Sequence, residues 1–411
     1  MNLDKEFLLN ESKTFCMFPW VHLNVTPKGD IYPCCSNDYT KPFGNTKKTS
    51  LKEAFNSDQM KQLRLDMLNE KKNDICTFCY KHEEAGPHSF RNYSKEQFSK
   101  RFDEIVPTTQ ADGTVEEFKM RYFDIRFSNI CNFKCRTCGS EFSSQWGAEM
   151  QKHFDDKHPI VIHADDGKGT VLQEVLSHIE YIDLAYFAGG EPLITDEHYV
   201  MLEEMIRLGK TDITLRYNTN ASNIKYKKHD ILDLWKYFKK IELSCSVDHY
   251  GERAEWLRKG TDWGKVENNL LTFRDLDYIS FQMNTVFSIF NYSTIGEFYS
   301  YLKSKNIVRR EDWYHSLYLA VHPSYYCAKS LPKELKVEAS AKALAWAEAN
   351  KDDNTSLSRL VTDAVNFASD RDQWHEVKDQ FIMHTRSIDR IREENFWEVF
   401  PELNKLQDLE E

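Results

Sequence analysis

Apolar and polar residues alternate regularly over the middle of the chain, from Lys119 to about Pro323. Short apolar runs typical of buried strands are separated by longer stretches with helical spacing. This alternation favours parallel βαβ units and therefore an α/β fold. The predicted strands are Tyr122–Phe127, Tyr181–Phe187, Ile213–Tyr217, Lys240–Val247, Ser280–Val286 and Leu317–Val321, with helices such as Tyr199–Leu208 and Asp230–Phe238 between them.

The segments on either side of this region have different patterns. Upstream, Val21–Val25 and Ile31–Cys35 read as the arms of a hairpin around the turn Pro27–Asp30. Ser50–Asn69 reads as a helix that begins with a capping box of Ser and Glu. Downstream, residues 333 to 411 are helical, with an apolar stripe from Leu357 to Ala368 at i, i+3, i+4 and i+7 spacing. We expect these helices to form a cap, with substrate or partner binding as the alternative.

Composition and charge restrict the class of protein. The 411 residues are sufficient for two or three domains, and 13% aromatic residues for substantial cores. A net charge of −11 argues against general nucleic-acid binding, which needs clustered Lys and Arg. No apolar run is long enough to span a bilayer, and the N-terminus lacks a signal-peptide pattern. We therefore expect a cytoplasmic protein whose ten cysteines are ligands or thiols rather than disulfides.

Three cysteines follow the first predicted strand at CxxxCxxC spacing: Cys131, Cys135 and Cys138. Three thiolates from one loop can hold three irons of a [4Fe–4S] cube. The fourth iron then has no protein ligand and is open to a small chelating molecule, which is a catalytic arrangement. A structural metal loop is the alternative, although zinc prefers four protein ligands and no fourth Cys or His lies nearby.

A second motif, Gly189-Gly190-Glu191, ends the next predicted strand. Two glycines allow close backbone approach, and a carboxylate can pair with an ammonium group. Together the two motifs resemble the radical S-adenosylmethionine (SAM) enzymes, in which such a strand end binds the methionine amino group of SAM. The resemblance implies a partial (β/α)6 barrel of the TIM type, with the active site at the carboxyl ends of the strands. Every motif found here lies at such an end.

The N-terminal region holds five cysteines between residues 16 and 79. One cysteine before a hairpin, one at its end and a CxxC after a helix suggest a four-thiolate cage. The spacing resembles the twitch domain, the short relative of the SPASM domain, which carries an auxiliary [4Fe–4S] cluster. In most relatives this module follows the barrel, whereas here it precedes it. The alternative is a four-cysteine zinc knuckle. The ligands assigned are Cys16, Cys34, Cys76 and Cys79, with Cys35 as the spare.

The resemblance extends to five further residues at strand ends. Asn218 and Asn220 are expected to approach the SAM ribose, with an Asn-rich turn as the alternative. Ser246 and Arg258 are expected to bind the SAM carboxylate, because the planar fork of Arg suits bidentate pairing. Asp248 faces either ribose or substrate, unless it is a surface residue that begins a turn.

Two cysteines, Cys245 and Cys327, are required by neither cluster. Free cysteines often behave as small buried hydrophobes. The alternative is that one of them lies near the substrate and donates a hydrogen atom to a product radical. Together with Asp248 they are the catalytic candidates.

The expected organisation is a twitch-like auxiliary domain (1–95), a connector (96–120), a radical SAM partial barrel (121–330) and a C-terminal helical cap (331–411). By resemblance, the barrel cluster reductively cleaves SAM to a 5′-deoxyadenosyl radical, which abstracts hydrogen from a C–H bond of the substrate. A flavodoxin- or ferredoxin-type donor supplies electrons, and the auxiliary cluster carries them. The substrate expected is a peptide, with an aminoglycoside-type small molecule as the alternative. A non-catalytic iron–sulfur electron-transfer or redox-sensing protein is the alternative of a different class.

Overall fold

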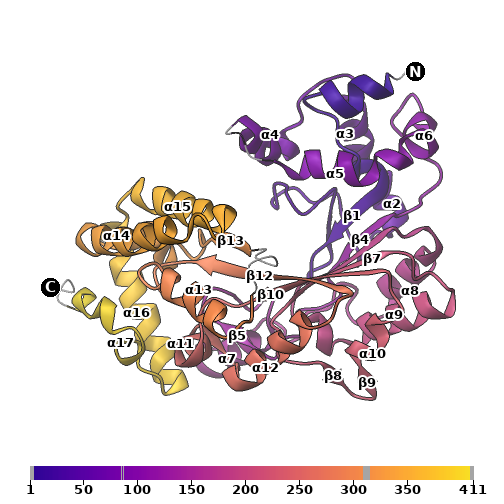
Figure 1. Cartoon of the computed structure of the whole chain (residues 1–411). Coiled ribbons are helices and arrows are strands. Elements are labelled where there is room, and N and C mark those ends of the chain that lie inside the picture. The colour runs from indigo at the N-terminus through magenta and orange to yellow at the C-terminus, as the bar shows by residue number, and fades with distance from the viewer. Residues whose placement is uncertain (1–3, 85, 87, 309–314, 408–411) are drawn as a thin grey trace. The chain divides into compact units, whose positions relative to one another are not determined.

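The chain forms two compact units, each assembled from segments distant in sequence (Figure 1). The computed structural model describes residues 4–84, 86, 88–308 and 315–407. The first unit comprises Met1–Ile130, Val161–Arg216 and Asp233–Lys240, and the second comprises Cys131–Ile160, Tyr217–Leu232 and Ile241–Glu411. Each unit is described by itself.

The first unit is built on strands in the order β6-β4-β1-β2-β3. β1 (His22–Val25) and β2 (Asp30–Tyr32) form the predicted hairpin, with Asn24 opposite Tyr32, and β3 (Gly44–Asn45) pairs with β2. The turn requires Gly29, whose φ is 88° and where a Cβ would meet the Ala164 carbonyl oxygen. β1 also pairs in parallel with β4 (Tyr122–Ile125), which pairs in parallel with β6 (Leu184–Phe187). The N-terminal hairpin is therefore continuous with the first strands of the α/β region.

The helices of the first unit largely follow their sequence signals. The capping box of Ser50 and Glu53 is present at the start of α2 (Leu51–Phe55). The predicted helix over Ser50–Asn69 is nevertheless wrong as one element, because Ser57 caps a second helix, α3 (Asp58–Leu68), by accepting from the Met60 amide. The other helices of this unit are α1 (Phe18–Val21), α4 (Thr77–Glu84), α5 (Phe90–Phe98), α6 (Phe102–Ile105), α8 (Thr170–Leu176) and α9 (Asp196–Arg207).

The second unit carries the parallel strands β10 (Lys240–Ser246), β12 (Ile279–Phe287) and β13 (His315–Leu319). With β4, β6 and β7 (Thr214–Thr219), which runs from one unit into the other, a strand is present at each of the six predicted places. The strand predicted from Tyr181 begins only at Leu184, because Ile179–Tyr181 forms a 3-10 helix. The predicted helix over Asp230–Phe238 is shorter, α10 (Ile231–Trp235). The remaining elements up to β13 are β5 (Lys134–Cys135), α7 (Ser144–Phe154), β8 (Lys225–Tyr226), β9 (His229–Asp230), α11 (Gly251–Leu257), β11 (Arg258–Lys259), α12 (Trp263–Arg274) and α13 (Ile295–Ser304).

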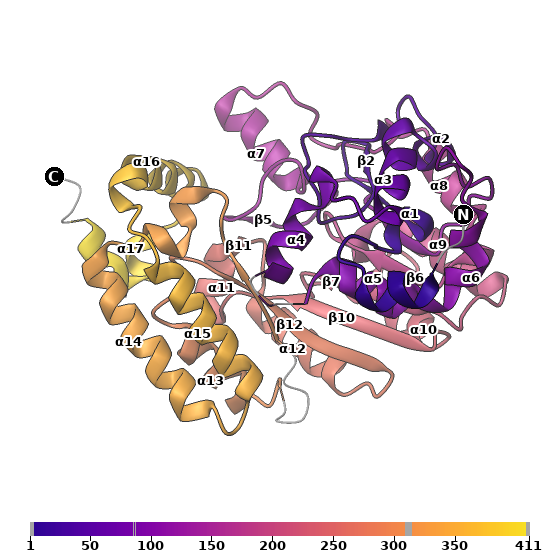
Figure 2. The same cartoon turned by 90° about the horizontal axis from the view of Figure 1, so that it is seen from above.

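The C-terminal region is helical, as predicted. α14 (Lys333–Asn350) and α15 (Thr355–Ser369) lie side by side, and α16 (Trp374–Arg392) and α17 (Phe396–Val399) follow (Figure 2). Trp256 of α11 contacts Phe290, Phe396 and Phe400, with ring centroids 5.0–5.5 Å apart. This aromatic cluster buries the last helices against the α/β part of the same unit.

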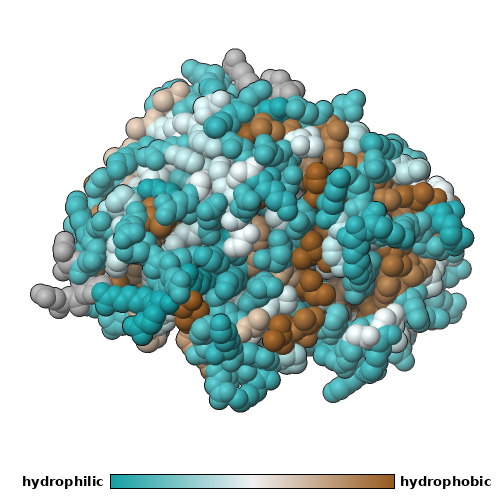
Figure 3. All heavy atoms as spheres, turned by 90° about the horizontal axis from the view of Figure 1, so that it is seen from below, coloured by the Kyte–Doolittle hydropathy of each residue, from teal (hydrophilic) through white to brown (hydrophobic). Residues whose placement is uncertain are grey.

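The surface is mixed in polarity. On the face seen in Figure 3, groups of hydrophobic residues lie among hydrophilic ones. No helix in the described part of the chain is both long and apolar enough to cross a membrane.

Candidate functional site

The CxxxCxxC loop is closed onto the beginning of α7. Ser143 caps this helix by accepting from the Trp146 amide, and its hydroxyl donates to the Phe133 carbonyl at 2.5 Å. The Trp146 indole donates to the Cys135 carbonyl at 2.7 Å. β5, which contains Cys135, pairs with β11. The loop is thus held at both its middle and its end.

Hydrogen-bond donors face the sulfurs of this loop. The Phe133 amide donates to Cys131 Sγ at 3.4 Å, and Arg258 Nη1 donates to Cys135 Sγ at 3.8 Å. Burial raises the pKa of the Cys135 thiol, and the Arg258 charge acts in the opposite direction. Donors aimed at sulfur favour the thiolate, which is the form that binds a metal.

Arg136, between two of the loop's cysteines, is fully buried. Its guanidinium forms ion pairs with Asp389 and Glu394 of the C-terminal region. It also lies 3.9 Å from the ring centre of Trp256. A second buried pair joins Arg392 to Glu149 of α7 at 2.8 Å. The C-terminal helices therefore hold the segment that carries the cysteines, a role that sequence reasoning missed because the partners are 253 residues apart.

The Gly189-Gly190-Glu191 turn needs both glycines. Their φ angles are 81° and 59°, and a Cβ on Gly190 would lie 2.2 Å from the Ile130 carbonyl oxygen. The Glu191 amide donates to that same carbonyl at 2.8 Å. Glu191 itself is buried, and one of its carboxylate oxygens accepts from the Leu193 amide at 3.1 Å. Both glycines are therefore required by the protein's own packing, because the Arg126 side chain and the Ile130 backbone lie against the turn.

The structure brings some of the other predicted SAM residues onto the cysteine loop. Asn220 donates to the Asn132 side chain, within the loop, at 2.9 Å. Arg258 binds Asp248 through two bonds of 2.9 and 3.1 Å, so its fork is paired within the protein. Asn218 accepts from Asn284 at 3.3 Å, and Ser246 ends β10 opposite Asn284.

The two spare cysteines are both buried. Cys245 lies within β10, and Cys327 lies between two short helical turns that follow β13. Burial raises the pKa of Cys327. Whether either contacts substrate stays a prediction.

The N-terminal cysteines are grouped in the first unit. Burial raises the pKa of Cys34, and the charges of Cys35, Cys76, Cys16 and Cys79 raise it further. Burial also raises the pKa of Cys16 to about 11. Cys34 Sγ accepts from the Ser36 amide at 3.4 Å, and Cys16 Sγ lies 3.1 Å from the Ser94 hydroxyl. Four thiols from three segments, with polar hydrogens beside them, fit the donor set of an iron–sulfur cluster.

A buried arginine also supports this group. Arg91 of α5 pairs with Glu83 and donates to the carbonyls of Ser12 and Phe15 at 2.9 and 3.1 Å. Burial acts to raise the pKa of Glu83, but its hydrogen bonds to Arg91 and Ser89 outweigh this effect and lower it.

Among the described residues, no three His, Cys, Asp or Glu side chains are placed to hold a metal ion.

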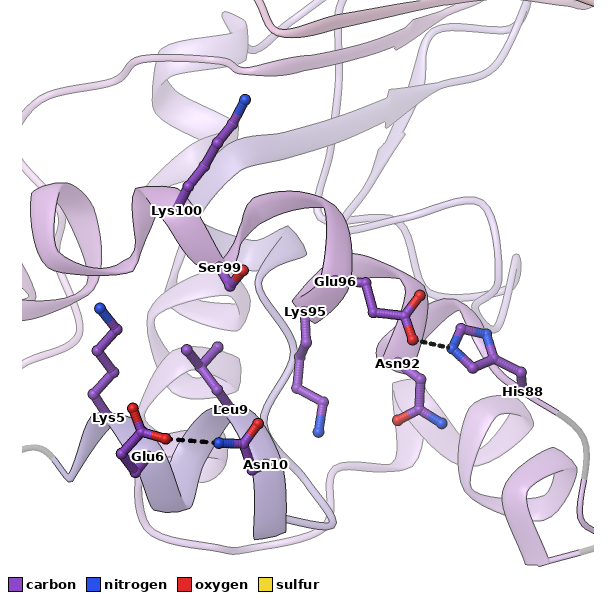
Figure 4. A pocket seen from close by; sticks show the side chains of 10 residues that line it. All are labelled: Lys5, Glu6, Leu9, Asn10, His88, Asn92, Lys95, Glu96, Ser99 and Lys100. Atoms are coloured by element: carbon purple, nitrogen blue, oxygen red, sulfur yellow. Dashed lines mark hydrogen bonds and ion pairs between the residues drawn. The ribbon is translucent and has the colours of Figure 1, made fainter. Parts of the chain in front are cut away.

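A separate pocket of about 610 Å³ lies in the first unit (Figure 4). Its lining carries both charges, including Lys5, Lys95, Glu6 and Glu96. His88 binds Glu96 at its rim at 2.8 Å. None of the predicted site residues lines it.

Comparison with known families agrees with this geometry. Residues 125–302 match the model of the radical SAM superfamily, and residues 16–80 match the SPASM iron–sulfur cluster-binding domain. The SPASM match thus precedes the radical SAM match along the chain. Its cofactors are therefore a [4Fe–4S] cluster with SAM, and auxiliary iron–sulfur in the N-terminal domain. The twitch subtype stays a prediction.

Solved structures give weaker likenesses. One is native anSMEcpe with bound AdoMet and Cp18Cys peptide, 20% identical over 56% of this chain and 60% of that chain, with a TM-score of 0.35. Another is Streptococcus suis SuiB bound to S-adenosylmethionine, 15% identical over 73% and 64%, with a TM-score of 0.36. The chain thus spans less than two thirds of either protein. No curated protein matches it.

Proposed function

We propose that the protein is a radical SAM enzyme that abstracts a hydrogen atom from a C–H bond of its substrate, with a peptide as that substrate. The observation that carries this proposal is the match of residues 125–302, which contain both the three-cysteine loop and the Gly-Gly-Glu turn, to the radical SAM superfamily. The barrel cluster and SAM, when bound, supply a 5′-deoxyadenosyl radical for this step.

The chain's own residues have separate tasks in this proposal. Cys131, Cys135 and Cys138 hold the barrel cluster. Glu191, which is buried at the end of the Gly-Gly-Glu turn, holds the methionine amino group. Asn218, Asn220, Ser246 and Arg258 are proposed to orient the rest of SAM. Arg258 is already fixed by Asp248, which supports a preorganised position for its charge.

The N-terminal domain is proposed to be of the twitch type, with Cys16, Cys34, Cys76 and Cys79 as ligands of an auxiliary [4Fe–4S] cluster. Four protein ligands leave no iron open, so this cluster would transfer electrons rather than bind substrate. Cys16 and Cys79 are buried and Cys34 and Cys76 are half-buried, which supports this assignment, because a cluster shielded from water exchanges electrons without side reactions. A flavodoxin- or ferredoxin-type protein is the proposed electron donor.

The proposed division is an auxiliary domain (1–95), a connector (96–120), a (β/α)6 partial barrel (121–330) and a helical cap (331–411). The parallel pairs β4–β6, β10–β12 and β12–β13 support the barrel. All ten cysteines lie within the described residues and none forms a disulfide, which supports the proposed cytoplasmic compartment.

The peptide is preferred over an aminoglycoside-type small molecule by the resemblance to SPASM-bearing relatives. SuiB has been seen with the precursor peptide SuiA, which is a property of that protein. Cys245, Cys327 and Asp248 remain the proposed catalytic candidates near the substrate.

The test is formation of 5′-deoxyadenosine by the anaerobically reconstituted, reduced protein with SAM. A radical SAM enzyme releases it, whereas an electron-transfer or redox-sensing protein does not. The Cys131→Ala variant is the matched control, since it keeps the auxiliary domain. Absence of 5′-deoxyadenosine from protein with full iron content contradicts the proposal.

A further inference from the structure

The pocket shown in Figure 4 contains an ammonium group that no acidic side chain of the described residues neutralises. Lys95 of α5 is only 9% exposed, and its side chain extends into the pocket. Among the described residues its Nζ forms neither an ion pair nor a hydrogen bond. Water can solvate this ammonium group but cannot balance its charge, and a charge so far withdrawn from solvent is destabilising unless an opposite charge lies beside it.

The two acidic residues that line the pocket bind other side chains. Glu6 accepts a hydrogen bond from the Asn10 amide group at 2.8 Å, and Glu96 binds His88 at 2.8 Å. Both glutamates are exposed, and neither forms an ion pair with Lys95. The pocket therefore presents its positive charge in the interior and its negative charges at exposed positions.

The charges around Lys95 leave positive charge in excess. Burial lowers the pKa of Lys95, the charges of Arg91 and Lys13 lower it further, and the charge of Glu83 acts in the opposite direction. Glu83 is already paired with Arg91. An anion that enters the pocket would therefore find a cation without a competing carboxylate of the protein.

Neutral hydrogen-bond donors lie on the same face as this cation. Asn92, Lys95 and Ser99 are three and four residues apart, so their side chains lie on one side of α5 and of the turn that follows it, and all three line the pocket. Among the described residues, the side chains of Asn92 and Ser99 have no hydrogen-bond partner. They offer an N–H₂ and an O–H beside the ammonium group, which are donors that suit an oxyanion.

We propose that this pocket binds a carboxylate, whose charge pairs with Lys95 and whose oxygens accept from Asn92 and Ser99. One unpaired ammonium group matches a single negative charge. Phosphate, with about two negative charges, would be repelled more strongly by Glu6 and Glu96. The volume of about 610 Å³ lies within the range of roughly 300–1,000 Å³ that ligand pockets occupy, so it holds more than the carboxylate alone. The site shares no residue with the proposed SAM and cluster sites, so the inference does not rest on the proposed function.

The test is equilibrium dialysis of the iron–sulfur-reconstituted protein against four probes. N-acetyl-trialanine and butyrate carry a carboxylate from two sources, a peptide terminus and a free acid. N-acetyl-trialanine amide lacks the charge, and inorganic phosphate replaces the carboxylate with another oxyanion. We expect saturable binding of one molecule per chain for at least one of the two carboxylates, and weaker binding of the amide and of phosphate. Whichever of N-acetyl-trialanine and butyrate binds more tightly identifies the source.

Two lysine variants distinguish a site from general attraction by charge. Lys95→Gln keeps a hydrogen-bond donor but removes the charge, and should weaken carboxylate binding roughly ten- to a hundred-fold. Lys100→Gln is the matched control, because Lys100 is exposed and its side chain extends away from that of Lys95 (Figure 4). Solvent and salt screen an exposed charge, so this variant should bind the carboxylate as the wild type does.

Folding is checked independently of binding. Because Lys95 forms no ion pair among the described residues, Lys95→Gln should keep both the iron content and the free energy of unfolding of the wild type. Equal weakening by the two substitutions overturns the proposal. So does binding of the amide as tightly as its acid, tighter binding of phosphate, or saturable binding of neither carboxylate.

Discussion

The two cysteine groups are built alike around the sulfur atoms but are held in different ways. In each, the amide two residues beyond a cysteine donates to its sulfur at 3.4 Å, from Ser36 to Cys34 and from Phe133 to Cys131. Each also has a buried arginine beside it, Arg91 or Arg136. The difference is how far along the chain the acidic partner of each arginine lies.

Arg91 pairs with Glu83, only eight residues away, and with carbonyls next to Cys16. Arg136 pairs with Asp389 and Glu394, more than 250 residues away. The auxiliary group is thus held by its own segment, whereas the radical SAM loop depends on the end of the chain. Support from nearby residues suits a module that occurs at different places in different chains. Support from the C-terminal helices means that the radical SAM loop is held in place only once those helices have folded.

The largest effect is expected when the cysteines of one group are replaced. Two independent groups predict about eight irons per chain after anaerobic reconstitution, falling to about four in the Cys131→Ala, Cys135→Ala, Cys138→Ala variant, which should lose SAM cleavage completely. Iron and sulfide analysis measures this. About four irons in the wild type, or stoichiometric zinc in the N-terminal group, would contradict it.

The next test removes the distant support. Arg136→Leu removes the guanidinium from Asp389 and Glu394, although Trp256 and the Phe396 amide still donate to Asp389 and Lys259 still pairs with Glu394. The free energy of unfolding should fall by about 1–3 kcal/mol. Because the loop loses its anchor, the barrel cluster should assemble poorly while the auxiliary cluster is retained. Denaturant unfolding and iron content measure the two effects.

Arg91→Leu is its counterpart. This variant should affect the auxiliary cluster alone, and less strongly, because the Glu83 side chain is more exposed than those of Asp389 and Glu394. If both variants lose the same cluster, the two supports are not separate.

A third test asks whether SAM binding is separable from cluster assembly. Glu191→Gln removes a charge but keeps the shape, and a charged hydrogen bond contributes about 1.5–3 kcal/mol. SAM affinity should fall roughly ten- to a hundred-fold, with the barrel cluster intact. SAM titration followed by electron paramagnetic resonance measures the affinity. Unchanged affinity at full iron content would remove Glu191 from the site.

The smallest expected effect concerns the spare cysteine. Cys35→Ala should keep the auxiliary cluster, whereas Cys34→Ala should lose it. The charges of Cys16, Cys76 and Cys79 act on Cys34, whereas the charges that act most on Cys35 are those of Asp124 and Arg126. Absorption spectra of the reconstituted variants distinguish them. Loss in the first variant and retention in the second would reverse the ligand assignment.

The sequence by itself determined what depends on neighbouring residues. The cysteine spacings, the Gly-Gly-Glu turn, the capping box of Ser50 and all six strands could be predicted, because turn chemistry and hydrophobic period are local properties. The helix over Ser50–Asn69 was wrong as one element. Serine favours the N-cap position, and Ser57 begins a second helix there.

Only the tertiary structure decided which distant side chains meet. Nothing local in the sequence indicates that Asp389 binds the arginine between two cluster cysteines, or that the strand of Asp124 pairs with the N-terminal hairpin. Nor does the alternation Asn24–Val25 or Asp124–Ile125 say whether its polar side meets water or lies buried. Burial is a property of the assembled fold, and it leaves Asn24 and Asp124 hydrogen-bonded to each other across β1 and β4 instead of to water.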